Sequence, residues 1–333
     1  MAEAQGDDDE VFVYMGGDQR VPDGVRRARI HKSVKIVRAR AFKNREHMIS
    51  VEFHDEIEII EEEAFYYCKL RGAIKLLGVT IVKERAFCGC SKLTDVEFGD
   101  KLETIGKNGF RGTGLKSIRI PSVRTIGVEA FAWCKELSNV QCGEALRTLQ
   151  VQAFSYSRKL ERIALPLKGG MIEDDVFFFC EDLTTINLVG GIHQTVASLH
   201  MESWRNEMND EINRMNQTLS TAAAWQKIGE YDGKDILSRS TDERRKTDKI
   251  RQWMESVIHH LDHYKDEHHK LLKEAATLLE LALWKTNLVG KKEGKGKGVR
   301  AAGEVENSRD EIRYTSGASI VIKNVLPFLA LKL

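Results

Sequence analysis

The sequence predicts an α+β protein in which a solenoid of about seven to eight coils, each 21–23 residues long, precedes a long helical hairpin or coiled-coil-like segment. Two observations predict this fold. Phenylalanine recurs at intervals of 23, 22, 23, 21, 23 and 23 residues between positions 42 and 177. After about residue 200, apolar residues instead follow at three- and four-residue steps, as on one face of a helix. Self-similarity at such a period is typical of a solenoid, whose coils bury their apolar edges by stacking on one another.

Each coil of the repeat carries the same apolar columns. The recurring phenylalanines are Phe42, Phe65, Phe87, Phe110, Phe131, Phe154 and Phe177. Upstream of each lies a pair of apolar residues two apart with polar residues around it, such as Ile118 and Ile120. This alternation indicates a half-buried strand. We expect each coil to hold a short strand, a bend, a second extended piece and a helical or 3₁₀ turn that carries the phenylalanine, with strands of adjacent coils pairing in parallel.

Cysteine also follows the repeat. Four cysteines stand three residues after a repeat phenylalanine, and serine or threonine takes that phase in two other coils: Cys68, Cys90, Cys134, Cys180, Ser157 and Thr113. A repeated phase implies a repeated environment, and a small buried site suits a free thiol. A metal or redox site at Cys88-Gly89-Cys90 is the alternative, but no further ligands accompany it. We expect structural, unpaired cysteines.

One column of strand residues is expected to point outward, because each member lies between two buried strand positions. The candidate partner-binding face consists of Arg29, Glu52, Lys75, Glu97, Arg119, Gln141 and Asn187. In solenoids such a face commonly binds partners. The alternative is that opposite charges on neighbouring strands satisfy each other, each pair contributing about 0.2–1 kcal/mol.

The motif from Leu115 to Cys134, Leu-x-x-Ile-x-Ile-Pro followed by Val-x-x-Ile-Gly-x-x-Ala-Phe-x-x-Cys, resembles the BspA-type leucine-rich repeat. The likeness covers about residues 25–200. It implies a solenoid without catalytic residues that serves adhesion or protein recognition. Residues 263–288 and 315–333 are also similar to the tail that follows such repeats in diatom proteins, a likeness that implies shared architecture and no activity.

The rest of the chain divides by composition. We expect an acidic N-terminal segment and cap over 1–24, the solenoid over 25–200, and a helical region over 201–288. A basic glycine-rich linker over 289–308 and an apolar tail over 309–333, docked on the protein, complete the chain.

Within the helical region, apolar spacing predicts a helix over Met201–Leu219, a loop over Thr221–Arg239 and a second helix from about Asp242 to Leu288. Ser240 and Glu243 have the spacing of a capping box. The long apolar stripe must be covered by the first helix, by the end of the solenoid or by a second copy of the chain.

Five histidines crowd the second helix: His259, His260, His263, His268 and His269. His259 and His263 lie one turn apart and could share a zinc ion, but a third ligand would have to come from elsewhere. A solvated face is the favoured interpretation, and His268 is expected to pack within the apolar stripe.

These observations favour a non-catalytic interaction scaffold for an unidentified protein partner, with the helices used for homo-oligomerisation or docking. The alternatives are a metal-binding protein or enzyme built on the histidine-rich helix, and a surface adhesin. We expect no cofactor and no metal. With 51 basic and 50 acidic residues, the net charge of +1 gives no general attraction to nucleic acid or membrane. The acidic opening MAEAQGDDDE lacks a signal peptide's apolar core, so an intracellular location, in cytoplasm or nucleus, is expected.

Overall fold

The computed structural model describes residues 11–190, 202–228 and 246–264, together with the single positions 266, 269, 270, 273, 277 and 280. The described residues up to 261 belong to one compact unit, and those from 262 onward belong to a second. The predicted capping box, basic linker and apolar tail lie outside the described residues.

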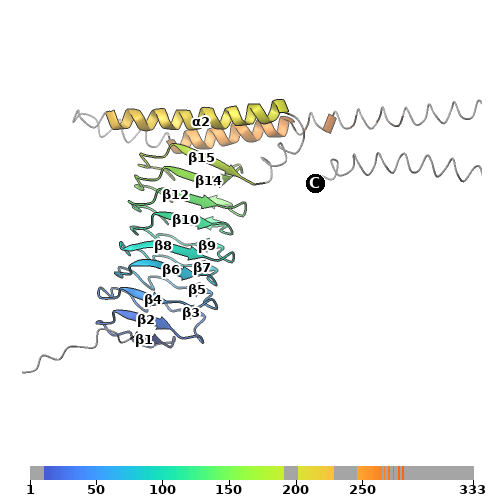
Figure 1. Cartoon of the computed structure of the whole chain (residues 1–333). Helices are drawn as coiled ribbons and strands as arrows, with labels where there is room; N and C mark the ends of the chain where they lie inside the picture. Colours follow the sequence, from blue (N-terminus) through green and yellow to red (C-terminus); the bar gives the residue numbers. More distant parts are fainter. Residues whose placement is uncertain are drawn as a thin grey trace, which may run out of the picture. The chain divides into compact units, whose positions relative to one another are not determined.

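The first unit is a stack of coils whose longer strands follow one another in chain order (Figure 1). They are β1 (Val11–Tyr14), β2 (Arg27–Ile30), β4 (Ser50–Glu52), β6 (Gly72–Leu76), β8 (Leu93–Phe98), β10 (Ser117–Ile120), β12 (Asn139–Cys142), β14 (Arg162–Pro166) and β15 (Thr185–Val189). All pair in parallel, in the groups β1-β2-β4, β6-β8 and β10-β12-β14-β15. The two breaks fall where the phenylalanine interval shortens to 22 and 21 residues.

A second, narrower sheet holds two-residue strands from the same coils. These are β3 (Ile36–Val37), β5 (Ile59–Ile60), β7 (Ile81–Val82), β9 (Thr104–Ile105), β11 (Thr125–Ile126) and β13 (Thr148–Leu149), in consecutive parallel pairs. The second residue of each strand is buried, and a bridge between Leu149 and Ile172 extends the pattern into the next coil. The predicted second extended piece of each coil is therefore confirmed.

The core between the sheets is a continuous stack of phenylalanine rings. All seven repeat phenylalanines are fully buried. Successive rings lie 4.9–6.1 Å apart between centroids and are tilted by only 5–8°. Tyr14 continues the stack at its N-terminal end, 5.1 Å from Phe42. Because each ring is covered by its neighbours, burial depends on the adjacent coils, as expected of a solenoid.

The turn around each phenylalanine differs from the prediction. A helical or 3₁₀ turn was expected, but the residues two before and two after each repeat phenylalanine have positive φ. A left-handed residue at every fourth position interrupts any helix. Alternate N–H groups of the turn bond to the next coil, such as Phe65 N–H to Ala86 C=O at 2.8 Å, while those between them bond within the turn, such as Tyr66 N–H to Glu63 C=O at 3.1 Å.

At the N-terminal end of the stack, a side chain satisfies the outer edge of β1. The amide of Gln19 accepts a hydrogen bond from Met15 N–H (2.6 Å) and donates one to Val13 C=O (3.3 Å). Unpaired strand edges invite pairing with other chains. Gln19 therefore occupies groups of β1 that a further strand would use.

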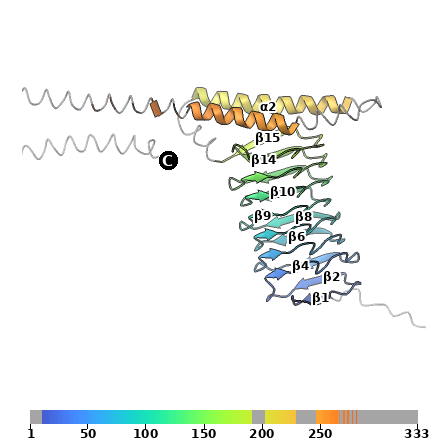
Figure 2. The same ribbon diagram turned by 180° about the vertical axis from the view of Figure 1, so that it is seen from behind.

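Two helices contact the last coil, α2 (Glu202–Ile228) and a second helix through its residues 246–261 (Figures 1 and 2). Asn216 of α2 accepts a hydrogen bond from Ile186 N–H of β15 at 2.9 Å. Thr247 Oγ1 accepts from Phe177 N–H at 3.1 Å, and Lys246 Nζ donates to Cys180 C=O at 2.6 Å. The helices thus bond to backbone groups of the last coil. In the inner coils the N–H groups equivalent to that of Phe177 bond to the backbone of the next coil.

The apolar faces expected on both helices are buried as far as the structure describes them. Their buried members are Met208, Met215, Leu219, Ile250, Met254, Val257, Leu261 and Tyr264. The loop predicted from Thr221 is wrong in its first part, because α2 continues to Ile228. No helix among the described residues combines the length and the apolar character needed to cross a bilayer.

Candidate functional site

The predicted partner-binding face is present as one exposed column. Arg29, Glu52, Lys75, Glu97, Arg119, Gln141 and Asn187 are all exposed on the longer strands. Arg29 stands in register with Glu52, Lys75 with Glu97, and Arg119 with Gln141. Strand pairing thus fixes the relative positions of the two side chains in each of these three pairs.

Four members of this column form two ion pairs. The Arg29 guanidinium lies 2.5 Å from the Glu52 carboxylate, and Lys75 Nζ lies 2.9 Å from that of Glu97. Hydrogen bonding to Glu52 raises the pKa of Arg29, and hydrogen bonding to Glu97 raises the pKa of Lys75. Because all four side chains are more than half exposed, these pairs contribute little to stability. They leave an ordered polar surface.

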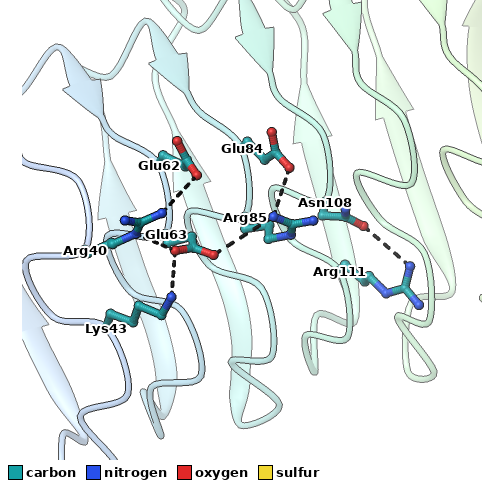
Figure 3. Close-up of polar contacts among 8 residues, drawn as sticks. All are labelled: Arg40, Lys43, Glu62, Glu63, Glu84, Arg85, Asn108 and Arg111. Carbon is teal, nitrogen blue, oxygen red and sulfur yellow. Dashed lines mark hydrogen bonds and ion pairs between the residues drawn. The ribbon is translucent and has the colours of Figure 1, made fainter.

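A second surface, which we call the turn face, is formed by the residues flanking the repeat phenylalanines. Its polar part centres on Glu63. This residue is buried and is one of the positive-φ residues of the turn, with φ of +54°. Lys43 and Arg40 donate to one Glu63 oxygen at 2.7 and 2.8 Å (Figure 3). These bonds hold the pKa of Glu63 below its usual range.

The cluster continues along neighbouring coils. Arg40 also pairs with Glu62 at 3.6 Å, and Arg85 pairs with Glu84 at 3.2 Å. Arg111 lies next in the row, beside Asn108 (Figure 3). Since Arg40, Lys43 and Arg85 face the carboxylates of Glu62, Glu63 and Glu84, the charges balance. Ion pairs such as Arg40–Glu63 link neighbouring coils. These six side chains carry no excess positive charge that would attract an anionic ligand.

An aromatic column runs beside this polar cluster, two residues after each repeat phenylalanine. Its members in coil order are Asn44, Tyr67, Gly89, Gly112, Trp133, Tyr156 and Phe179, all with positive φ. The rings of Trp133 and Tyr156 stack 4.2 Å apart at 9°, and those of Tyr156 and Phe179 lie 5.0 Å apart. Tyr67 is 50% exposed and Trp133 38% exposed. Aromatic residues at exposed, ordered positions are typical of binding hot spots.

Sequence analysis missed this column. The signal was available, because four of the seven residues at this phase are aromatic. What the sequence could not reveal is the backbone conformation, since bulky residues rarely adopt positive φ. That conformation places their side chains at one repeated position of the turn face, where Tyr67 and Trp133 are exposed and Tyr156 and Phe179 are half-buried.

The cysteines occupy structural positions. None of the six forms a disulfide, and all six are buried. Burial raises the pKa of the Cys68 thiol to about 12 and that of Cys134 to about 11. The pKa values of Cys88 and Cys90 are raised as well, also through burial. Because the thiolate is the form that binds metals and attacks disulfides, these sites do not suit either chemistry.

The histidines offer no assembled site in the part of the chain that is described. His259, His260, His263 and His269 are exposed on their helix, and His268 lies outside the described residues. No group of three or more His, Cys, Asp or Glu side chains among the described residues could hold a metal ion.

Several solved bacterial structures are similar to this chain. A leucine-rich repeat protein from Bacteroides ovatus is 28% identical over 54% of this chain and 45% of its own, with a TM-score of 0.45. A leucine-rich cell surface protein from Faecalibacterium prausnitzii is 19% identical over 50% of this chain and 61% of its own, with a TM-score of 0.32. The pneumococcal vaccine antigen PcpA is 18% identical over 55% of this chain and 67% of its own, with a TM-score of 0.32.

The chain spans less than half the length of the Bacteroides ovatus protein. A search of curated proteins gave no match. The family model described as the BspA type leucine-rich repeat region, in six copies, matches residues 24–127 and 103–206, more than half of the chain. With its stacked phenylalanines and parallel coils, the chain therefore belongs to the BspA-type leucine-rich repeat family.

Proposed function

We propose that the chain is a non-catalytic scaffold that recognises a protein partner through the candidate partner-binding face on its longer strands, called the sheet face below. Membership in this repeat family suggests protein interaction or a role as a surface protein. The observation that carries the proposal is the column of seven exposed side chains on the longer strands, six of which stand in strand register as three pairs.

The distribution of charge along the column supports a partner that is charged at one end of its binding surface and polar but uncharged at the other. Charged residues stand at the N-terminal part of the column, and Gln141 and Asn187 stand at its other end. Complementary charges steer association and fix register more than they add affinity. A partner that binds here is expected to present charges at the spacing of the coils and a polar, uncharged surface further along.

The helices are proposed to dock on the solenoid, with oligomerisation as a further role. The buried faces of α2 and residues 246–261, and their hydrogen bonds to the last coil, support docking. Sedimentation velocity of the full chain over a range of concentrations tests the second role, which predicts a dimer that dissociates on dilution.

Affinity capture with the full chain tests the sheet face. Glu52→Arg/Glu97→Arg reverses two charges and breaks both ion pairs. Glu58→Arg/Glu103→Arg is a matched control, because these exposed glutamates pair with Lys35 at 3.2 Å and with Arg124 at 4.0 Å, next to the narrow sheet. We expect the first variant to lose partners that the wild type and the control retain. Equal recovery by all three would remove the sheet face from the proposal.

A further inference from the structure

The aromatic column of the turn face has three positions without a ring, Asn44 at its N-terminal end and Gly89 and Gly112 within it, and the two glycines differ. Gly89 is already covered. A Cβ built on it would lie 3.0–3.1 Å from three ring atoms of Tyr67, so that ring leans onto the glycine. Tyr67 of one coil therefore fills the ring position of the next coil.

Gly112 is open. Outside its chain neighbours, nothing lies within 4 Å of a Cβ built on it. Trp133, in the next coil, does not lean toward Gly112 as Tyr67 leans toward Gly89, because its ring stacks on Tyr156. One face of the Trp133 indole is thus covered by Tyr156, and the other is turned toward the side of the column where a ring is missing.

The neighbouring side chain of Arg111 is held elsewhere. Its guanidinium pairs with the Glu129 carboxylate and lies 3.5 Å from Asn108 Oδ1, on the polar side of the turn face. Among the described residues, the one cation found over an aromatic ring is Lys43, 5.1 Å from the centre of Tyr66. The charges next to Gly112 therefore balance each other, which favours an uncharged occupant.

The backbone does not require glycine at this position. Gly112 has φ of +67°, whereas Tyr67, Trp133, Tyr156 and Phe179 have φ of +55° to +61° with aromatic side chains. Such residues persist in this conformation only when the surrounding structure holds them there. The absence of a side chain at Gly112 thus leaves a space in a column that holds rings at four of its seven positions.

We propose that this space, between Gly112 and the open face of Trp133, binds an aromatic side chain of a protein partner, which completes the column. Aromatic rings stack offset at centroid distances of about 4.5–7 Å, and the Trp133–Tyr156 and Tyr156–Phe179 distances of 4.2 and 5.0 Å show the spacing here. A flat ring fits one missing position. A puckered sugar or aliphatic ring is thicker and lacks a π face.

This surface is separate from the sheet face, so either assignment can fail while the other holds. The full chain labelled with 5-fluorotryptophan provides the test by ¹⁹F NMR. The chain has five tryptophans, of which four follow residue 200 and serve as internal references. Trp133→Phe assigns the resonance of interest.

The probe is N-acetyl-tyrosine amide, compared with N-acetyl-cyclohexylalanine amide and cellobiose. We expect the tyrosine amide to shift the Trp133 resonance saturably, with at least a severalfold larger shift than any other tryptophan. Gly112→Tyr, which fills the space within the chain, should abolish that shift while far-UV circular dichroism stays unchanged.

Three results would overturn the proposal: no selective shift at Trp133, an equal response to cyclohexylalanine amide, or a response to cellobiose alone, which would indicate a carbohydrate platform. The wild-type titration decides the matter even where Gly112→Tyr fails to fold, because planar and puckered probes of similar size are compared on the same protein.

Discussion

The thiol of Cys68 donates a hydrogen bond to the carbonyl oxygen of Phe42 in the preceding coil, at 2.9 Å. The same bond recurs from Cys90 to Phe65, from Cys134 to Phe110 and from Cys180 to Phe154, at 3.1–3.2 Å. Ser157 makes it with its hydroxyl to Phe131 at 2.8 Å. In these five coils the repeated small residue is therefore a hydrogen-bond donor that links a phenylalanine turn to the next coil, whereas Thr113 donates to Phe110 of its own coil at 2.8 Å.

Ser157 provides a direct test of this role. It is fully buried and also accepts a hydrogen bond from Cys134 N–H at 3.2 Å. Ser157→Ala removes both bonds and should lower the free energy of unfolding by about 1–3 kcal/mol. Ser157→Cys keeps a donor of the kind used in other coils and should cost less. Urea unfolding of both variants measures this, and an alanine variant as stable as the cysteine variant would contradict it.

The buried thiols predict a loss of stability at high pH. Burial raises the pKa of Cys68 and Cys142 to about 12 and that of Cys134 to about 11, whereas a thiol in the unfolded chain titrates near about 8.5. Below that pH both states keep their protons. Above it the unfolded chain releases protons that the folded chain retains, so stability falls as pH rises toward the folded pKa values.

Each thiol should contribute a slope of up to about 1.4 kcal/mol per pH unit in this range. Unfolding midpoints of the wild type and of Cys68→Ser/Cys134→Ser/Cys142→Ala, measured from pH 7 to pH 11 (roughly the window between the two sets of pKa values), isolate this effect. The variant should show a shallower decline, because it lacks three of the buried thiols. Lysine and tyrosine titration is common to both proteins and therefore does not contribute to the difference. Parallel curves would show that the thiols do not cause the decline.

Sequence periodicity was sufficient to predict the strands of each coil. Because Ile118 and Val140 carry the same apolar phase, their pairing across β10 and β12 could be predicted, and the register confirms it. The helical turn was predicted wrongly, since nothing in the side chain of Trp133 or Gln152 signals positive φ. The end of α2 was also missed, because the small and polar residues from Thr221 onward suit a loop as well as a helix.

The two candidate surfaces also differ in how far the sequence predicts them. Arg29 and Glu52 could be placed on one face from alternation alone, since strand side chains point to opposite faces in turn. The open space at Gly112 depends on where the rings of Tyr67 and Trp133 lie, and a sequence does not contain that. Contacts such as Thr247 with Phe177, 70 residues apart, likewise leave no periodic trace.

The phenylalanine stack predicts a strong effect of shortening one ring. Phe110 is fully buried between Phe87 and Phe131, at 5.1 and 5.6 Å. Phe110→Ala should cost about 3–5 kcal/mol through lost burial and the cavity left behind. Phe110→Leu, which refills part of the space, should cost less. Thermal unfolding followed by circular dichroism compares them, and equal midpoints for wild type and Phe110→Ala would exclude a stacked core at this coil.

The contact between the last coil and residues 246–261 of the second helix predicts an effect confined to one end of the stack. Thr247 is fully buried, and its hydroxyl accepts the Phe177 N–H at 3.1 Å. Thr247→Val keeps the shape of the side chain but leaves that buried N–H without its acceptor, at a cost of about 1–3 kcal/mol.

In a solenoid each coil depends mainly on its neighbours, so the loss should be greatest in the coil of Phe177. Hydrogen–deuterium exchange should therefore accelerate around Phe177 in Thr247→Val and stay unchanged near Phe65. Thr247→Ser, which keeps the hydroxyl, is the matched control, and equal acceleration in both variants would show that lost packing, and not the hydrogen bond, is responsible.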